Sequence, residues 1–183
     1  PTKGWLKANI DGAFNNINME GGISGVVRDS KERWNTAFSM KVHAISPMQT
    51  ELQALMHALQ IIIREHMFPI EVETDATEII SIINKDYSTN NELCHICRLL
   101  VEEASRKGRI LFKHSFREGN MVAHILAKEA LRRTSFNRLC TFCKPPDFVM
   151  DVYDKYREGY VYARSCSSKH CETLITLGNN SAL

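Results

Sequence analysis

The sequence predicts an α/β domain with a mixed five-stranded sheet, three antiparallel strands followed by two parallel ones, and helices on both faces. Three observations predict it. The first forty residues hold short apolar runs separated by Gly, Asn, Asp and Ser, as in a β-meander. Later apolar runs alternate with segments of helical periodicity, which implies parallel pairing. The length, 183 residues, suits one domain with a substantial core.

Three strands are expected first. A polar loop with Asn15-Asn16 and two glycines follows the first strand, and a turn that starts at Asp29 follows the second. These strands should cover residues 6–14, 23–28 and 34–42.

The first long helix should begin at Ser46-Pro47. Ser46 is a good N-cap, proline suits the first helical position, and Gln49 can complete a capping box. Apolar residues then recur at helical spacing until Met67-Phe68-Pro69 ends the helix. The expected buried face comprises Leu52, Leu55, Leu59, Ile62 and Ile63.

The second half continues with strands and helices in alternation. Strands are expected at 70–74 and 109–116, the second with His114 near its end. Asn120 is expected to cap the last helix, which ends near Leu131. Two further helices should start at Asp75 and Asn91.

The domain is expected to cover residues 1–145. The pattern dissolves after Pro145, so 146–183 is interpreted as a C-terminal extension, disordered from about residue 165. The chain has no run of about 18 apolar residues, so no membrane association is expected. We expect a monomer.

Charge and cysteine content exclude little. The net charge of +2 does not indicate a nucleic-acid partner, although residues 98–138 hold ten Lys or Arg against four Asp or Glu. Such a stretch can bind phosphates or simply form a solvated helix face. Two Cys-x-x-Cys pairs, at 94–97 and 140–143, are 42 residues apart, too far for common zinc ribbons. Reduced, partly buried thiols in an intracellular protein are the favoured interpretation.

Three carboxylates occupy positions from which they can converge. Asp11 follows one apolar run, Asp75 follows another, and Glu51 lies in the first turn of the long helix, beside its buried face. Oxygen ligands of this kind suit Mg²⁺ or Mn²⁺. Taken singly, the three residues are equally compatible with a turn residue, a helix-dipole partner and an N-cap.

Five motifs in this order resemble the ribonuclease H family, most closely the ribonuclease H-like domains of plant and retroelement-derived proteins. They extend over residues 5–131. The motifs are Asn9-Ile10-Asp11-Gly12-Ala13-Phe14, Gly25-Val26-Val27-Arg28-Asp29, Thr50-Glu51-Leu52-Gln53-Ala54-Leu55, Glu73-Thr74-Asp75, and the run from His114 to Ala127.

The resemblance implies a metal-dependent nuclease. Asp11, Glu51 and Asp75 match three of the four residues that hold two divalent ions in the family. The fourth family carboxylate is replaced by His124, which is expected either to ligate a metal, favouring Mn²⁺ over Mg²⁺, or to mark a weakened or decayed site.

Arg117 matches a basic residue of archaeal-type relatives. Because a guanidinium stays protonated, Arg117 should bind phosphate rather than act as a base; a solvated loop charge is the alternative. The resemblance also implies contacts to RNA–DNA hybrids through shape and sugar hydroxyls. Candidate contacts are Gly12, Ala13, Asn15, Asn16, Arg28, Lys113, His114 and Arg117.

Three functions follow from these observations. The first is an endonuclease that hydrolyses the RNA strand of RNA–DNA hybrids, with an activity that His124 is expected to reduce. The second is a nucleic-acid-binding module that keeps the fold and has lost the chemistry. The third is a nuclease-fold relative with another substrate, such as an exonuclease or an integrase-like core.

Overall fold

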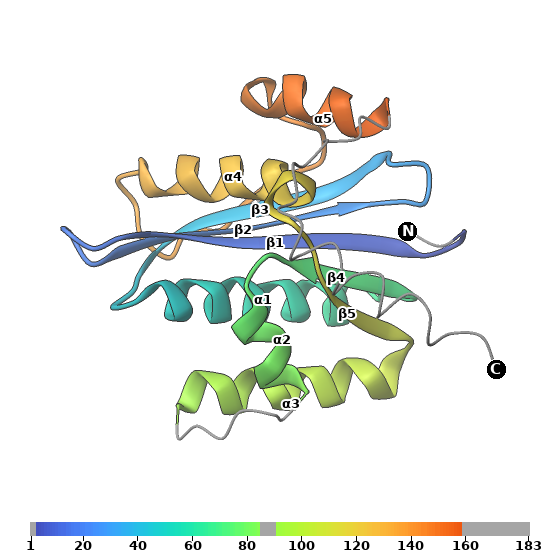
Figure 1. The fold of residues 1–183 in the computed structure, drawn as a ribbon, viewed down its shortest axis with the longest axis horizontal. Helices are drawn as coiled ribbons and strands as arrows, with labels where there is room; N and C mark the ends of the chain where they lie inside the picture. The colour runs from blue at the N-terminus through green and yellow to red at the C-terminus, as the bar shows by residue number, and fades with distance from the viewer. Residues whose placement is uncertain (1–2, 85–90, 159–183) are drawn as a thin grey trace, which may run out of the picture.

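A six-stranded mixed sheet forms the centre of the computed structural model, which describes residues 3–84 and 91–158 (Figure 1). The strand order is β5-β4-β1-β2-β3-β6. The strands are β1 (Leu6–Asn15), β2 (Glu20–Arg28), β3 (Trp34–His43), β4 (Ile70–Thr74), β5 (Ile110–His114) and β6 (Cys140–Phe142).

The pairing confirms the predicted mixed sheet. Strands β1, β2 and β3 form an antiparallel meander, whereas β1, β4 and β5 pair in parallel. Strand β1 therefore lies inside the sheet, because it pairs with antiparallel β2 on one side and with parallel β4 on the other.

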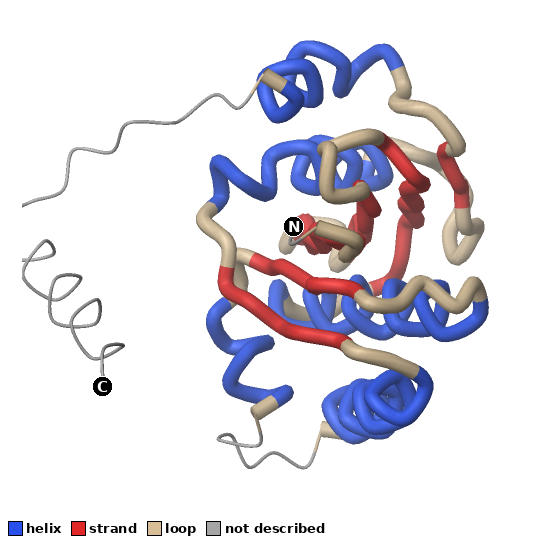
Figure 2. The backbone as a smooth tube through the Cα atoms, turned by 90° about the vertical axis from the view of Figure 1, so that its right-hand side faces the viewer, coloured by secondary structure: helices blue, strands red, loops and turns tan. Residues whose placement is uncertain are grey.

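Helices cover both faces of the sheet (Figure 2). On one face α1 lies against the strands and α3 packs on α1, with α2 beside them; on the other face α4 lies on the sheet and α5 packs over α4 (Figure 1). The helices are α1 (Pro47–Arg64), α2 (Thr77–Ile83), α3 (Glu92–Lys107), α4 (Met121–Leu131) and α5 (Met150–Arg157).

The start of α1 follows the predicted chemistry. The Ser46 hydroxyl accepts a hydrogen bond from the Gln49 amide at 3.2 Å, and Pro47 occupies the first turn. The Gln49 side chain accepts from the Ile45 amide at 2.7 Å, one residue before the residue expected for a capping box. The helix start is therefore fixed by local residues.

Two apolar clusters lie on opposite faces of the sheet. The larger contains the buried faces of α1 and α3 against the strands, including all five apolar residues predicted for α1. The smaller lies under α4 and α5, and its members are Val26, Ala37, Val122, Ala123, Leu126, Val149 and Tyr153.

Strand β6 and helix α5 were not predicted. Strand β6 has only three residues and pairs with the outer edge of β3, so the sheet has six strands rather than five. Strand β6 is too short for a periodic signal, and α5 is mostly polar, with Tyr153 as its one buried residue. They form because β3 offers a free edge and α4 an apolar surface.

The packed unit extends past the boundary expected at residue 145. Val149 and Tyr153 are buried in the smaller cluster, so α5 belongs to the same domain. The disorder expected from about residue 165 falls outside the described residues. Within the described part of the chain, no helix combines the length and apolar character needed to cross a membrane.

The described cysteines are free thiols. Cys94 and Cys97 are buried between α3 and α1, and the Cys97 thiol donates to the Leu52 carbonyl at 3.4 Å. Burial raises the pKa of Cys97 to about 12. Both are therefore core residues, as the sequence favoured.

Candidate active site

Asp11 and Asp75 meet because of the register between two parallel strands. Asn9 of β1 pairs with Glu73 of β4, so Asp11 and Asp75, each two residues farther on, lie next to one another at the end of β4. Asp11 is 3% exposed, whereas Asp75 is partly exposed. Two carboxylates from two strands thus share one edge of the site.

Glu51 reaches the same point from the fifth residue of α1, just past the first turn in which the sequence placed it. The helix approaches β1 closely because Gly12 has no side chain: a Cβ there would lie 2.7 Å from the Glu51 amide nitrogen. Gly12 therefore has a packing role at the site.

The three carboxylates form a candidate metal centre. Among the described residues, Asp11, Glu51 and Asp75 are the only group of three possible ligands, with ligand atoms all within 4.8 Å of one another. The sequence-based expectation that they converge is thus consistent with the geometry.

The electrostatics of the group are unfavourable without a cation. Burial, followed by the charges of Asp11 and Asp75, raises the pKa of Glu51 to about 9. Burial also raises the pKa of Asp11, an effect that the hydrogen bond from His124 opposes. One oxygen of Glu51, Oε2, is buried and has no hydrogen-bond partner among the described residues.

His124 contacts the centre through Asp11. Its Nδ1 lies 3.0 Å from Asp11 Oδ2, and its Nε2 lies 3.0 Å from a guanidinium nitrogen of Arg117. Because a guanidinium can only donate, the network assigns Nε2 as the acceptor and Nδ1–H as the donor to Asp11. His124 thus connects Arg117 to Asp11 through its two ring nitrogens.

Asn120 holds two parts of the site together, a role that the sequence did not indicate. Its side-chain amide donates to the Ile10 carbonyl at 2.8 Å and to Asp75 Oδ1 at 3.4 Å. It does precede α4 as predicted, but its side chain makes no capping hydrogen bond to the described residues. A buried asparagine thus links the end of β4, β1 and the start of α4.

Comparison with known proteins identifies the family. Residues 9–130, two thirds of the chain, match the family model described as Reverse transcriptase-like. The chain belongs to the ribonuclease H family.

An Arabidopsis thaliana protein named as a ribonuclease H protein is 28% identical over 130 residues. The match covers 71% of this chain and 21% of that protein, so the chain spans about a fifth of its length.

Solved structures show the same fold. Ribonuclease H1 of Halobacterium salinarum has a TM-score of 0.62 at 21% identity, covering 70% of this chain and 98% of that one. The N-terminal ribonuclease H domain of Rv2228c from Mycobacterium tuberculosis has a TM-score of 0.62 at 14% identity, covering 69% and 92%. LC11 ribonuclease H1, solved in complex with an RNA/DNA hybrid, has a TM-score of 0.59 at 19% identity, covering 69% and 96%.

The candidate nucleic-acid contacts of this ribonuclease H domain divide into two groups. Asn16, His114 and Arg117 are exposed, and Asn15 is partly exposed and accepts from the Ile17 amide. Lys113 is half-exposed and pairs with Glu71 at 3.1 Å.

Two candidates are buried and are not retained as contacts. Ala13 is 8% exposed. Arg28 is 4% exposed, and its guanidinium donates to Asn9 and Glu32 inside the protein. The sequence does not predict this burial, because Asn9 and Tyr156, which both contact the Arg28 guanidinium, lie in other elements.

The basic stretch 98–138 does not form one surface. Its residues lie on α3 on one side of the sheet and on η1 (Arg117–Asn120) and α4 on the other (Figure 1). Arg98, Arg132 and Arg133 also make internal polar contacts. The excess of basic residues therefore supports phosphate binding only in the region near Arg117.

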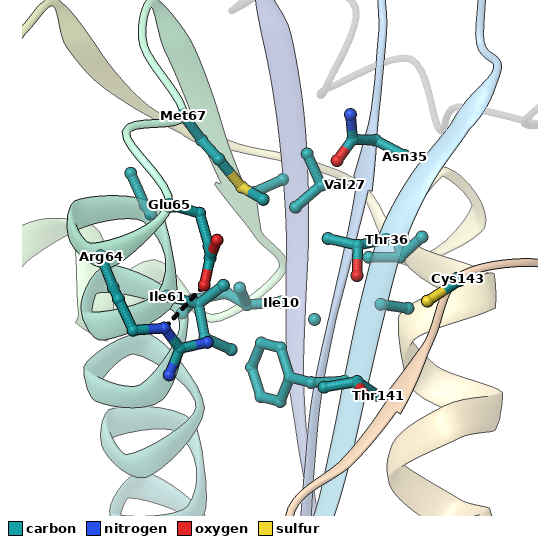
Figure 3. A pocket seen from close by; sticks show the side chains of 17 residues that line it. Ile10, Val27, Asn35, Thr36, Ile61, Arg64, Glu65, Met67, Thr141 and Cys143 are labelled. Atoms are coloured by element: carbon teal, nitrogen blue, oxygen red, sulfur yellow. Dashed lines mark hydrogen bonds and ion pairs between the residues drawn. The ribbon is translucent and has the colours of Figure 1, made fainter.

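A cavity of about 390 Å³ lies away from the carboxylates. It opens between the end of α1 and strands β1, β2 and β3, with Ile10, Val27 and Ile61 inside and the Arg64–Glu65 ion pair at its rim (Figure 3). None of the three carboxylates lines it. The candidate active site of this ribonuclease H domain is instead the carboxylate centre with His124 and Arg117.

Proposed function

We propose that this ribonuclease H domain is a divalent-metal-dependent endonuclease that hydrolyses the RNA strand of RNA–DNA hybrids. The convergence of Asp11, Glu51 and Asp75 carries the proposal. Family membership and the hybrid bound to LC11 ribonuclease H1 support the choice of substrate. The proposal concerns this domain, since the Arabidopsis relative is several times longer.

The residues present fit a hard divalent cation. Glu51, with a pKa of about 9, would hold a proton at neutral pH, and a nearby cation would favour its charged form. The unpartnered buried oxygen of Glu51 is a further ligand atom in need of a partner. We therefore assign Asp11, Glu51 and Asp75 to hold Mg²⁺ or Mn²⁺, as two ions in the arrangement that the family implies.

Bound ions of this kind would activate water for in-line attack at phosphorus and stabilise the leaving 3′ oxygen. The protein contributes orientation. His124 donates to one oxygen of Asp11 and so fixes the direction of that carboxylate. Arg117 is exposed beside it and carries a permanent positive charge, which suits it to bind a substrate phosphate.

Substrate contacts are proposed along the edge next to this centre. Exposed His114 is the last residue of β5 and exposed Arg117 follows that strand, whereas Asn15 ends β1 and Asn16 comes directly after it. Gly12 and Lys113 remain weaker candidates, because Gly12 packs on α1 and Lys113 pairs with Glu71. Such contacts would sense backbone shape and sugar hydroxyls.

A second candidate function is a nucleic-acid-binding module without catalysis. The observation that favours it is His124, whose two ring nitrogens are engaged by Asp11 and Arg117, where the family pattern has a fourth carboxylate. Loss of one charged oxygen ligand would weaken cation binding.

A labelled-hybrid cleavage assay separates the two. Cleavage would be measured in Mg²⁺, in Mn²⁺ and in chelator, with Asp75→Asn as the inactive control. We expect metal-dependent cleavage that is faster in Mn²⁺ than in Mg²⁺ and abolished in Asp75→Asn. Hybrid binding without cleavage in either metal would select the second function.

A further inference from the structure

Helix α5 lies outside the segment that matches the family, yet it packs against the helix that carries His124. The family match ends at residue 130, and α5 covers Met150–Arg157. Val149, directly before α5, and Tyr153, in its middle, are buried in the smaller apolar cluster with residues of α4. This packing places the end of α5 at the start of α4.

The start of α4 is capped by α5 and not by its own sequence. The first amides of a helix have no intrahelical partner. Asn120 would normally supply the cap, but its side chain is directed to Ile10 and Asp75. The Tyr156 hydroxyl instead accepts from the Met121 amide at 2.6 Å and the Val122 amide at 3.3 Å.

The same hydroxyl joins two segments of the active site. It donates to the Glu118 carbonyl at 3.1 Å, in the short helix η1 that precedes α4. Arg117 lies in η1 and His124 lies in α4. One hydroxyl therefore fixes the junction on which the Arg117–His124 contact depends.

Tyr156 is itself held in place from the sheet. The Arg28 guanidinium lies over its ring, 4.6 Å from the ring centre, and also donates to Asn9. Asn9 in turn donates to Glu73 of β4 at 3.1 Å. This gives buried Arg28 a purpose that differs from phosphate binding: it connects Tyr156 to the two strands that present Asp11 and Asp75.

We propose that α5 braces the active site and that Tyr156 is a positioning residue, which sets His124 and Arg117 through the start of α4. Its effect on catalysis rests on the proposed function. Its effect on the junction of η1 and α4 does not, so the two can be tested separately.

The chain supplies a matched pair of variants. Tyr156→Phe removes one hydroxyl and keeps the ring over Arg28. Tyr153→Phe removes the hydroxyl three residues earlier on the same helix, whose partners are the Trp34 amide and the Glu32 carbonyl, away from α4. Amide hydrogen exchange at Met121 and Val122 would be measured by NMR, alongside hybrid-cleavage kinetics.

In the unmodified protein we expect Met121 and Val122 to exchange slowly, although they are the first two amides of α4. Tyr156→Phe should accelerate their exchange roughly fivefold to tenfold, because a buried donor loses its acceptor. It should lower kcat by roughly tenfold and leave KM within about twofold, the pattern of a misplaced catalytic group. Tyr153→Phe should change none of these by more than about twofold.

Fast exchange of Met121 and Val122 in the unmodified protein would contradict the proposal, and that measurement needs no folded variant. Equal effects of the two variants on kcat would reduce Tyr156 to a general stabilising residue and overturn its positioning role. So would accelerated exchange with an unchanged kcat. If the unmodified domain cleaves no hybrid, the proposed function fails, whereas the exchange result still decides whether α5 braces the junction.

Discussion

His124 lies in α4 at the position for which the resemblance noted from the sequence implies an aspartate. A carboxylate at this position could ligate a cation, whereas the histidine donates a hydrogen bond to Asp11. The contact with Arg117 keeps the proton of the imidazole on Nδ1. In the proposed function the remaining three carboxylates would bind the cations, at a centre with one carboxylate fewer than the resemblance implies.

An aspartate at position 124 should lower the stability of the metal-free protein and raise its affinity for Mg²⁺. In chelator, His124→Asp loses a hydrogen bond to Asp11 and adds like charge, so we expect a loss of about 1–3 kcal/mol in the free energy of unfolding. With Mg²⁺ it gains a ligand, so its melting temperature should rise more on adding Mg²⁺ than that of the unmodified protein, and cleavage in Mg²⁺ should be faster. Thermal melts with and without Mg²⁺ measure the first effect. An equal Mg²⁺-induced rise in His124→Asn, which adds no charge, would contradict the ligand argument.

Glu51 makes the metal-free protein sensitive to pH. Its folded-state pKa of about 9 lies above the ordinary value of 4.5, so between these pH values the folded state keeps a proton that the unfolded state has released. The resulting stability is full below pH 4.5, declines as the pH rises through this window and is lost above about pH 9. Asp11, whose pKa is also raised, acts in the same direction.

Glu51→Gln should remove the Glu51 part of this dependence. In chelator the variant should melt near the temperature of the unmodified protein at pH 5 and at least about 2–4 °C higher at pH 8.5, equivalent to about 1 kcal/mol. Adding Mn²⁺ should reverse the order at pH 8.5, because the variant lacks a charged ligand. Melting curves at the two pH values test this, and a constant difference between them would contradict it.

At the scale of elements, α4 rests on β2 through a close backbone approach. The Ser24 hydroxyl donates to the Ala123 carbonyl at 2.6 Å. A Cβ at Gly22 would lie 2.0 Å from the Ala127 carbonyl oxygen, a backbone atom that cannot turn aside. The position of His124 over Asp11 thus depends on a glycine from a strand far away in the sequence.

Gly22→Ala should displace α4 and destabilise the protein by about 1–3 kcal/mol, as expected for overpacking. Gly119→Ala is the matched control: the glycine is exposed, and its added methyl would meet the rotatable Ser115 hydroxyl at 2.9 Å. Denaturant unfolding should show a large loss for the first and a small change for the second. Similar losses for both would argue against a specific β2–α4 contact.

The whole molecule has two cores on one sheet, and the smaller is completed by residues beyond the family match. Val149 and Tyr153 are at most 5% exposed and pack on Val26, Ala37 and Val122. Without α5, the outer surface of α4 and part of β3 would be open to water.

A chain ending at Lys144 should therefore be less stable than one ending at Glu158, which keeps every described element. Exposing the partners of Val149 and Tyr153 should cost about 3–6 kcal/mol, which corresponds to a melting temperature lower by roughly 10 °C. Thermal melts of the two chains test this, and equal melting temperatures would support the domain boundary expected at residue 145.

The sequence by itself determined the order of the longer strands and helices and the identity of the three carboxylates at the candidate site. Patterns set by neighbouring residues can be recognised without knowledge of the fold. Strand periodicity, the cap at Ser46 and the motifs around the three carboxylates are of this kind. It also exposed His124 as a departure from the family pattern. Short elements were missed, since three residues of β6 carry no period and α5 gains its order from burial.

The tertiary structure alone decided how these residues act. The bond from His124 to Asp11 joins residues 113 positions apart, and the buried pairing of Arg28 with Asn9 and Tyr156 joins three elements. Asn120 precedes α4 as predicted, but its side chain donates to the Ile10 carbonyl and to Asp75. The Tyr156 hydroxyl caps the helix in its place. The choice of hydrogen-bond partner depends on which groups are brought within about 3 Å, and only packing of the complete chain sets those distances.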